Sequence, residues 1–452
     1  MELHSLFEPR GVAVIGASAT EGKLGYEAMS NAVQYDGPVY PVNPSSDGEL
    51  FGESFVSSVT DIDGPVDLAL LCVPGPVVPH VLEECAESGV GAAVIFAGGF
   101  AEAGDDGAEL QDAIIEIANA NEIALLGPNT SGFVIPETKL YASFVSGIDE
   151  VTPGSVALIA QSGGVAHDVT FRATDEGYGI GAMIGLGNRA NVGFVDVIEY
   201  LDEAAFCEAI ALHIEGVPDA RKLLETCDKL STPVIAYKVG QAEVGDFAKS
   251  HTGALTGEYA LYQAGFAQYG VLPADSTTEL FDAALSHARN PVPQGANVGV
   301  ITAQAGPGII ITDYLKRADV HLPALSDETM AAIEDVLPGI TYVDNPVDTG
   351  RPMPEFGDVV RTVATDPSVD IVLVFVIFEQ AVGYPVDTFI DIKESIQKPV
   401  VVGTQGPPAM MQDALAELKE ANIPVYTSPE RTAEAVISLA RTGAAAYGGD
   451  AR

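Results

Sequence analysis

Short runs of consecutive hydrophobic residues recur along the whole chain, and the stretches between them carry apolar residues at every third or fourth position. An unbroken apolar run predicts a strand that is buried on both faces, and the three-to-four spacing predicts an amphipathic helix. Strands that alternate with helices predict an α/β fold with parallel sheets, which bind ligands at the carboxyl ends of their strands. In the first third of the chain, strands are predicted at 11–16, 39–44, 66–73, 92–98 and 123–129, with helices at 77–89 and 107–122.

The same pattern repeats twice more after clear breaks. A proline and glycine break, "EVTPG" at 150–154, precedes predicted strands at 155–160, 180–187, 209–216 and 233–240. The loop "NPVPQGAN" at 290–297 is the clearest linker, and further strands are predicted at 298–308, 371–378, 399–408 and 423–428. The sequence therefore predicts three α/β domains, with boundaries at 1–148, 149–292 and 293–452.

Composition narrows the class of protein. Hydrophobic residues make up 47% of the 452 residues, yet no apolar run approaches the roughly 18 residues of a membrane-spanning helix. The start, "MELHSLFEPRG", has acidic residues and a proline where a signal peptide carries a basic segment followed by an apolar one. We therefore expect a cytoplasmic protein that does not enter a membrane.

The charge balance is strongly acidic. Sixty-four acidic residues against 21 basic ones give a net charge of −43, and the acidic residues are scattered rather than gathered in a tail. Such a charge repels nucleic acid and anionic membranes, so neither is expected as a partner. A cytoplasm with molar salt would screen the self-repulsion, so the charge predicts a halophilic source, with an ordinary acidic cytosolic enzyme as the alternative. The four cysteines form no CxxC pair, and no metal-binding spacing is visible.

Two glycine-rich turns are candidate anion sites. In "VIGASATEGKLG" (14–25), Gly16 permits a sharp turn after the first strand, and Lys23 adds a positive charge near a helix start. The spacing is not GxGxxG and no acidic residue ends the next strand, so NAD is not expected. In "ALIAQSGGVAHD" (157–168), Ser162, Gly163 and Gly164 expose N–H groups at a second helix start. The first of these turns can also be a plain strand–helix connection without a ligand.

An acidic residue and a histidine follow in the same predicted domain. Glu215 ends the strand of "ALHIEGV", and His251 lies in "KSHTGALTG" between Ser250 and Thr252, two residues that favour helix N-termini. A histidine that accepts a phosphoryl group would gain from such a helix start and from a carboxylate on its other ring nitrogen. Ser162, Glu215 and His251 also follow the chain order of an α/β-hydrolase triad, although Ala160 replaces the first glycine of the nucleophile motif. Alternatively, Glu215 is a solvent-exposed loop residue and His251 has a structural role only.

Nine short motifs in order give the chain its clearest resemblance. They are "VIGAS…GKLG", "PVNP", "CVPGP", "GPNTSG", "QSGG", "GN" at 187–188, "IEGV", "SHTGAL" and "DNPVD". In this order they resemble the NDP-forming acyl-CoA synthetases, whose α part is related to the α subunit of succinyl-CoA synthetase. ADP-forming acetate–CoA ligase is the most similar named activity. The resemblance implies a Rossmann-like CoA-binding domain followed by two flavodoxin-like doubly wound ligase domains.

The resemblance also implies roles for particular residues. His251 matches the histidine that is transiently phosphorylated, and Glu215 matches the glutamate that steadies it. The implied phosphate-binding residues are Ser162, Gly163, Gly164, Thr252 and Gly253. The implied CoA-binding residues are Gly16, Ser18 and Lys23 near the phosphates, Val73 and Pro74 near the adenine, and Pro128 and Asn129 near the thioester. No metal ligand is implied in this chain.

The implied reaction has three steps. Phosphate attacks acyl-CoA and releases CoA, His251 takes the phosphoryl group from the acyl phosphate, and the phosphohistidine passes it to ADP. The ADP site of the family lies in an ATP-grasp domain with Mg²⁺, and none is recognised here, so an ATP-grasp β subunit is expected as partner, in a heterotetramer by analogy. Ser45 and Thr130 stand where family members often carry lysine and cysteine, which leaves one phosphate contact unassigned. A CoA-binding regulatory or scaffold module without catalysis is the alternative.

Overall fold

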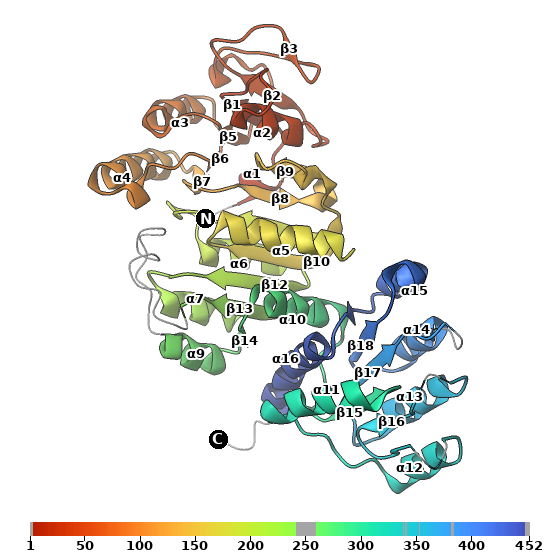
Figure 1. Cartoon of the computed structure of the whole chain (residues 1–452). Helices are drawn as coiled ribbons and strands as arrows, with labels where there is room; N and C mark the ends of the chain where they lie inside the picture. The colour runs from red at the N-terminus through yellow and green to blue at the C-terminus, as the bar shows by residue number, and fades with distance from the viewer. Residues whose placement is uncertain are drawn as a thin grey trace. The chain divides into compact units, whose positions relative to one another are not determined.

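The computed structural model describes residues 3–240, 259–337, 339, 341–351, 353–380 and 384–447. The chain forms two compact units, Met1–Pro273 and Ala274–Arg452. The first unit contains two large sheets and the second contains one, and Figure 1 shows the order of their elements. Each unit is described by itself below.

The first sheet has five parallel strands in the order β2-β1-β5-β6-β7. The strands are β1 (Val12–Ile15), β2 (Val39–Val42), β5 (Leu68–Leu71), β6 (Ala92–Ile95) and β7 (Ala124–Leu126). The helices are α1 (His4–Phe7), α2 (Leu24–Ala32), α3 (Val78–Glu87) and α4 (Asp105–Ala120), and a small hairpin joins β3 (Glu49–Leu50) to β4 (Glu53–Ser54). One face packs against α2 and the other against α3 and α4, which is why these strands are apolar on both faces.

The second sheet has seven strands in the order β14-β13-β12-β10-β11-β8-β9. Its strands are β10 (Pro153–Ala160), β11 (Ile180–Gly185), β12 (Ala209–Ile214), β13 (Val234–Lys238) and β14 (Leu272–Ala274), with β8 (Phe133–Ile135) and β9 (Leu140–Ala142) added antiparallel beside β11. Its helices are α5 (Gly163–Asp175), α6 (Phe194–Glu203), α7 (Ala220–Cys227) and α9 (Tyr259–Gln268). The strands β10 to β13 pair in parallel, as the apolar runs predict.

One hydrophobic core joins the two sheets of the first unit. It contains Val14 and Leu70 from the first sheet and Ile159 and Leu212 from the second. The strands β8 and β9 precede residue 148 in the sequence but extend the second sheet. The division into three domains at 148 and 292 stays a prediction.

The sheet of the second unit again has five parallel strands, in the order β16-β15-β17-β18-β19. They are β15 (Val298–Thr302), β16 (Val347–Asp348), β17 (Ile371–Ile377), β18 (Val400–Gln405) and β19 (Val425–Tyr426). One face packs against α11 (Ala305–Arg317) and α16 (Pro429–Tyr447), and the other against α12 (Asp327–Glu334), α13 (Phe356–Thr365) and α14 (Val386–Ser395). The remaining helices are α10 (Thr277–Arg289) and α15 (Pro408–Glu420).

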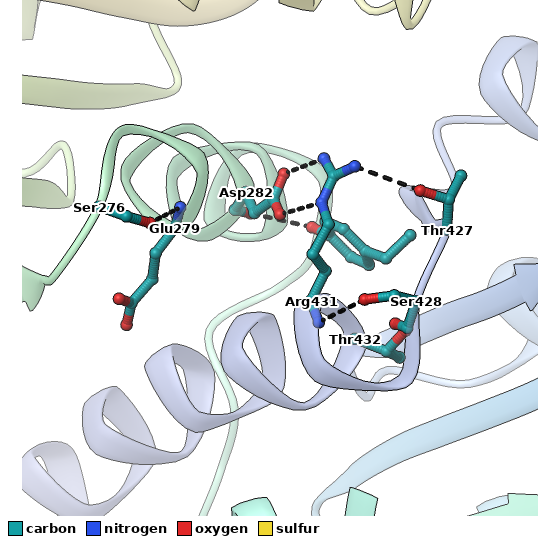
Figure 2. A network of polar contacts seen from close by, with 8 residues as sticks. Ser276, Glu279, Asp282, Thr427, Ser428, Arg431 and Thr432 are labelled. Carbon is teal, nitrogen blue, oxygen red and sulfur yellow. Dashed lines mark hydrogen bonds and ion pairs between the residues drawn. The ribbon is translucent and has the colours of Figure 1, made fainter. Parts of the chain in front are cut away.

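A buried ion pair joins α10 to the start of α16 in the second unit. Arg431 donates from Nε and Nη2 to the two carboxylate oxygens of Asp282, and both distances are 2.7 Å. Figure 2 shows the two side chains facing each other. Asp282 is only 1% exposed, and its backbone carbonyl accepts from the Tyr426 hydroxyl at 2.9 Å. The paired geometry fixes both the charge and the orientation of the two side chains.

Each five-stranded sheet places its first strand between the second and the third in chain order, and in the seven-stranded sheet β10 to β14 follow the same order, with β8 and β9 added at the edge. This 2-1-3-4-5 order creates a switch point between the first and third strands, where the following loops diverge to opposite faces and leave a crevice. In the first unit the switch points lie after β1 and β5, and after β10 and β12. The prediction of an α/β fold with parallel sheets is confirmed.

Candidate active site

A cavity of about 590 Å³ lies in the first unit at the carboxyl end of β10. Its walls come from the segments after β6, β7, β9 and β11, the turn from β10 into α5 and the end of β12. The lining residues are Phe96, Glu102, Asn129, Thr130, Ser131, Phe144, Val145, Gln161, Ser162, Gly163, Gly164, His167, Gly187, Asn188 and Glu215. The structure thus gathers five of the predicted site residues, namely Asn129, Ser162, Gly163, Gly164 and Glu215, around one space.

The turn into α5 directs the start of a helix at the cavity. Ser162 is the N-cap, and its Oγ accepts from the N–H of Val165 at 3.5 Å. A Cβ on Gly163 would lie 2.5 Å from Oγ of Ser131, so only glycine lets the helix start approach that loop. The first N–H groups of a helix have no carbonyl partner within it, so Gly163 and Gly164 offer donors to an anion in the cavity.

The end of β12 is tied to this turn by Gln161, which the sequence analysis did not single out. Its side-chain Oε1 accepts from the N–H of Glu215 at 3.0 Å and from that of Gly216 at 3.1 Å. Gln161 is only 6% exposed, so its position is set by the strand ends on either side. The carboxylate of Glu215 is therefore held on the same side of the switch point as the helix start.

Buried positive charge lies beside Glu215. Arg189 donates from Nη1 to the carbonyl of Gly216 at 2.8 Å. Burial lowers the pKa of Arg189, and the attraction of Glu215 opposes that shift. Lys238 is 1% exposed, and burial likewise lowers its pKa. The attraction of Glu215 offsets only part of that shift. His213 lies on β12, just ahead of Glu215, and is buried. Its burial, and to a smaller extent the charge of Lys238, lower its pKa to about 4. It is therefore neutral near pH 7.

An amide network holds the opposite wall. Asn188 donates from Nδ2 to Glu102 at 2.5 Å and to Gln111 at 3.0 Å, and Asn129 donates to Asn188 at 3.4 Å. Burial opposes the ionisation of Glu102, but the bonds from Asn188 and from the N–H groups of Gly99 and Phe100 outweigh it and lower its pKa. The predicted thioester residue Asn129 is thus held by its neighbours in a fixed orientation.

Thr130 has a clear structural contact at the position where the family often carries cysteine. Its hydroxyl donates to the carbonyl of Gly185 at 2.5 Å and accepts from the N–H of Gly132 at 3.0 Å. Thr130 therefore fastens the loop after β7 to the end of β11, and its side chain is 4% exposed.

The other predicted CoA residues lie at the switch point of the first sheet. A Cβ on Gly16 would lie 2.6 Å from the carbonyl oxygen of Cys72 and 3.1 Å from Val73, and its φ is +89°, so the turn requires glycine. Ser18 accepts from the N–H of Thr20 at 3.1 Å, and Lys23 is the exposed N-cap residue of α2. Gly16 and Val73 are in this way brought together, whereas neither lines the cavity described above.

Pro74 is exposed ahead of α3, and the carbonyl of Pro128 accepts from the N–H of Asn188 at 2.9 Å. Ser45 donates its N–H to the side chain of Asn43, which in turn donates to the carbonyl of Ala17. The predicted residues His251, Thr252 and Gly253 lie outside the described residues.

The described residues contain neither a candidate metal cluster nor a candidate membrane-spanning helix. Within 3–240, 259–337 and the later described ranges, no group of three or more His, Cys, Asp and Glu side chains could hold a metal ion. No helix in the described part of the chain has the length and apolar character needed to cross a membrane.

Two family models match consecutive parts of the chain. Residues 10–136 match a family described as a CoA binding domain, and residues 153–286 match the succinyl-CoA ligase like flavodoxin domain. The α subunit of acetate–CoA ligase [ADP-forming] II from Pyrococcus furiosus is 34% identical over 99% of this chain and 99% of its own length. The chain belongs to the family of ADP-forming acetate–CoA ligase α subunits.

Other ADP-forming ligases are similar to this chain over most of its length. The α subunit of the form I enzyme of the same organism is 36% identical over 97% of both chains. The acetate–CoA ligase [ADP-forming] of Methanocaldococcus jannaschii is 37% identical over 77% of this chain but only 49% of its own length. A structure of Ca. Korarchaeum cryptofilum acetyl-coenzyme A synthetase 1, described as a complex with phosphate and ADP, has a TM-score of 0.89 at 30% identity and covers 99% of both chains. The resemblance inferred from the nine motifs is confirmed.

Proposed function

We propose that this chain is the α subunit of an ADP-forming acyl-CoA synthetase. With its partner it converts acyl-CoA, ADP and phosphate reversibly into the free acid, CoA and ATP. The observation that carries the proposal is the cavity at the turn from β10 into α5. It joins anion-binding N–H groups at Gly163 and Gly164 to the carboxylate of Glu215, in a chain that matches known α subunits from end to end.

In the first step, phosphate binds at the N-terminus of α5, and the acyl-CoA thioester lies near Pro128 and Asn129. Phosphate forms a bond to the thioester carbonyl carbon, the C–S bond breaks, and CoA leaves an acyl phosphate behind. We assign the CoA moiety to the switch point of the first sheet, with Gly16, Ser18, Lys23, Val73 and Pro74 as its contacts. The CoA-binding family match over 10–136 supports this placement.

In the second step, His251 attacks the phosphorus of the acyl phosphate. A P–N bond forms, the bond between phosphorus and the acyl oxygen breaks, and the acid leaves as a carboxylate. Glu215 accepts a hydrogen bond from the other ring nitrogen and stabilises the charge that develops on the imidazole. Thr252 and Gly253 add donors for the phosphohistidine. The bonds from Glu215 and Gly216 to Gln161 support this role, because they hold the carboxylate at the cavity wall.

In the third step, the phosphohistidine passes its phosphoryl group to ADP. We assign ADP and Mg²⁺ to an ATP-grasp β subunit, in a heterotetramer with this chain, and the subunit names of the relatives support the need for a partner. The charge of −43 supports work in a cytoplasm of high salt, where repulsion between the acidic side chains is screened.

ATP formation tests the proposal. The chain is mixed in molar KCl with the candidate ATP-grasp chain of the same genome, acetyl-CoA or an aryl-CoA, ADP, Mg²⁺ and phosphate. We expect Glu215→Gln to lower the rate by about 100-fold, because the imidazole loses the charge that stabilises it. The control Glu199→Gln changes an exposed glutamate on α6 and keeps the wild-type rate. Binding of CoA without turnover of any acyl-CoA by wild type would favour the CoA-binding module instead.

A further inference from the structure

His167 is a buried side chain of the cavity to which the reaction described above gives no task. It lies one turn into α5, and its Nδ1 is 2.7 Å from the carbonyl oxygen of Gly163. A carbonyl oxygen can only accept, so Nδ1 carries the proton of the neutral ring. His167 is 9% exposed, and its Nε2 is buried without a hydrogen-bond partner in the described part of the chain. The neutral ring therefore keeps an Nε2 lone pair that no described group engages.

The surroundings explain what such a lone pair could accept. Among the described residues that line the cavity, His167 is the only one whose side chain can carry a positive charge, whereas Glu102 and Glu215 are acidic. An incoming phosphate finds N–H donors at Gly163 and Gly164, which satisfy its bare oxygens. A P–OH group needs an acceptor instead, and Nε2 of His167 is one on the same helix turn.

We propose that His167 is the proton carrier of acyl transfer, an assignment that rests on the proposed function. As monohydrogen phosphate attacks the thioester carbon, its P–OH proton moves to Nε2 and the C–O bond forms. The C–S bond breaks and its electron pair goes to sulfur. The imidazolium then gives the proton to the thiolate, which yields CoA thiol, acyl phosphate and a neutral imidazole. In the reverse direction the same nitrogen removes the proton of the CoA thiol.

The contact with Gly163 suits the ring to this exchange. Because Nδ1 donates to a backbone carbonyl, the ring orientation is the same before and after Nε2 takes a proton. Burial lowers the pKa of His167, and the bond to Gly163 opposes that shift, so the ring is neutral near pH 7 and ready to accept. Ser131, whose buried Oγ also lacks a partner among the described residues, can hydrogen-bond phosphate but holds no additional charge.

Two substitutions separate the proton transfer from a structural role. In His167→Asn the amide nitrogen replaces Nδ1 and keeps the bond to Gly163, but no atom replaces Nε2. In His167→Gln the amide group reaches the place of Nε2, where it can hydrogen-bond phosphate but cannot take its proton. We expect both variants to release CoA from acetyl-CoA and phosphate about 100-fold more slowly than wild type. The Gln variant is expected to keep its KM for phosphate.

The second half-reaction is the internal control. Transfer of label from acetyl phosphate to the chain needs no proton from phosphate, so both variants are expected to label at nearly the wild-type rate. Release of CoA at the wild-type rate by either variant would overturn the proposal, and an equal loss of labelling would show a distorted cavity instead of a lost proton carrier. If wild type itself neither releases CoA nor accepts label with the ATP-grasp partner present, the proposed function fails and the His167 step falls with it.

Discussion

Two adjacent glycines at the start of α5 give a matched test of how the cavity is built. A Cβ on Gly163 would lie 2.5 Å from Oγ of Ser131, closer than real Cβ atoms approach, and 3.1 Å from Cβ of Ser131, which is a tight contact. A Cβ on Gly164 would have only Oγ of Ser162 near it, at 3.8 Å, which is an ordinary contact. Gly163→Ala must therefore turn the Ser131 side chain and shift the helix start or the loop after β7 to relieve the tight Cβ contact, whereas Gly164→Ala need displace nothing.

The two substitutions are expected to change the free energy of unfolding in opposite directions. Overpacking costs about 1–3 kcal/mol in a well-packed site, and alanine returns up to about 1 kcal/mol by restricting the unfolded chain, so Gly163→Ala should lower the free energy of unfolding by about 1–2 kcal/mol. Gly164→Ala should leave it unchanged or raise it by up to about 1 kcal/mol. A shift of the phosphate donors near 1 Å is enough for about a 100-fold loss of rate in Gly163→Ala.

The assays are urea unfolding in molar KCl and release of CoA from acetyl-CoA in the presence of phosphate. The double variant Ser131→Gly with Gly163→Ala removes the two closest contacts, leaving the Ser131 backbone nitrogen at 3.5 Å. We expect it to recover most of the lost stability, as coupled neighbours do in a double-mutant cycle. Equal stability and equal rates for the two alanine variants would refute the reasoning.

Three further predictions concern stability. Asp282→Asn leaves the charge of Arg431 without its buried carboxylate and should cost the second unit about 3–5 kcal/mol in urea unfolding, whereas an unchanged midpoint would show that the pair contributes nothing. Burial and the nearby carboxylates of Glu279 and Asp282 raise the pKa of Glu434 to about 7, so the folded state binds a proton that the unfolded state releases, and stability is lost as pH rises through 7. Glu434→Gln should then raise the melting temperature at pH 8 relative to wild type, and an advantage at pH 5 as large as that at pH 8 would contradict this origin. The melting temperature of the whole chain should rise between about 0.1 M and 2 M KCl, and no change over that range would contradict the halophilic interpretation.

Most strands could be predicted from the sequence because they are buried on both faces. The run predicted at 209–216 is β12 (Ala209–Ile214), and that at 371–378 is β17 (Ile371–Ile377). The predicted runs extend past the strand ends because the apolar pattern continues into the buried start of the following turn, as at Leu186 after β11. The strands β8 and β9 were missed, since the antiparallel pairing of β8 with β11 and of β9 with β8 is decided by tertiary contacts.

The candidate site was predictable only in part. Ser162, Gly163 and Glu215 follow apolar strands directly, and strand ends meet at one edge of a parallel sheet. Gln161 was missed because a polar residue between a strand and a helix cap has no periodic signal, and its task appears only when β10 and β12 lie side by side. His167 lies in the motif at 157–168, but the sequence does not show which of its ring nitrogens forms a hydrogen bond and which is left without a partner.

Transfer of labelled phosphate onto the chain tests the central claim most directly. The protein in high KCl is mixed with acetyl-CoA and labelled phosphate, with and without the ATP-grasp partner, and wild type is compared with His251→Ala. Label that is acid-labile and base-stable, present in wild type and absent from the variant, is the predicted result. Absence of label from wild type with the partner and several acyl-CoAs present would contradict the account and leave a protein that only binds CoA.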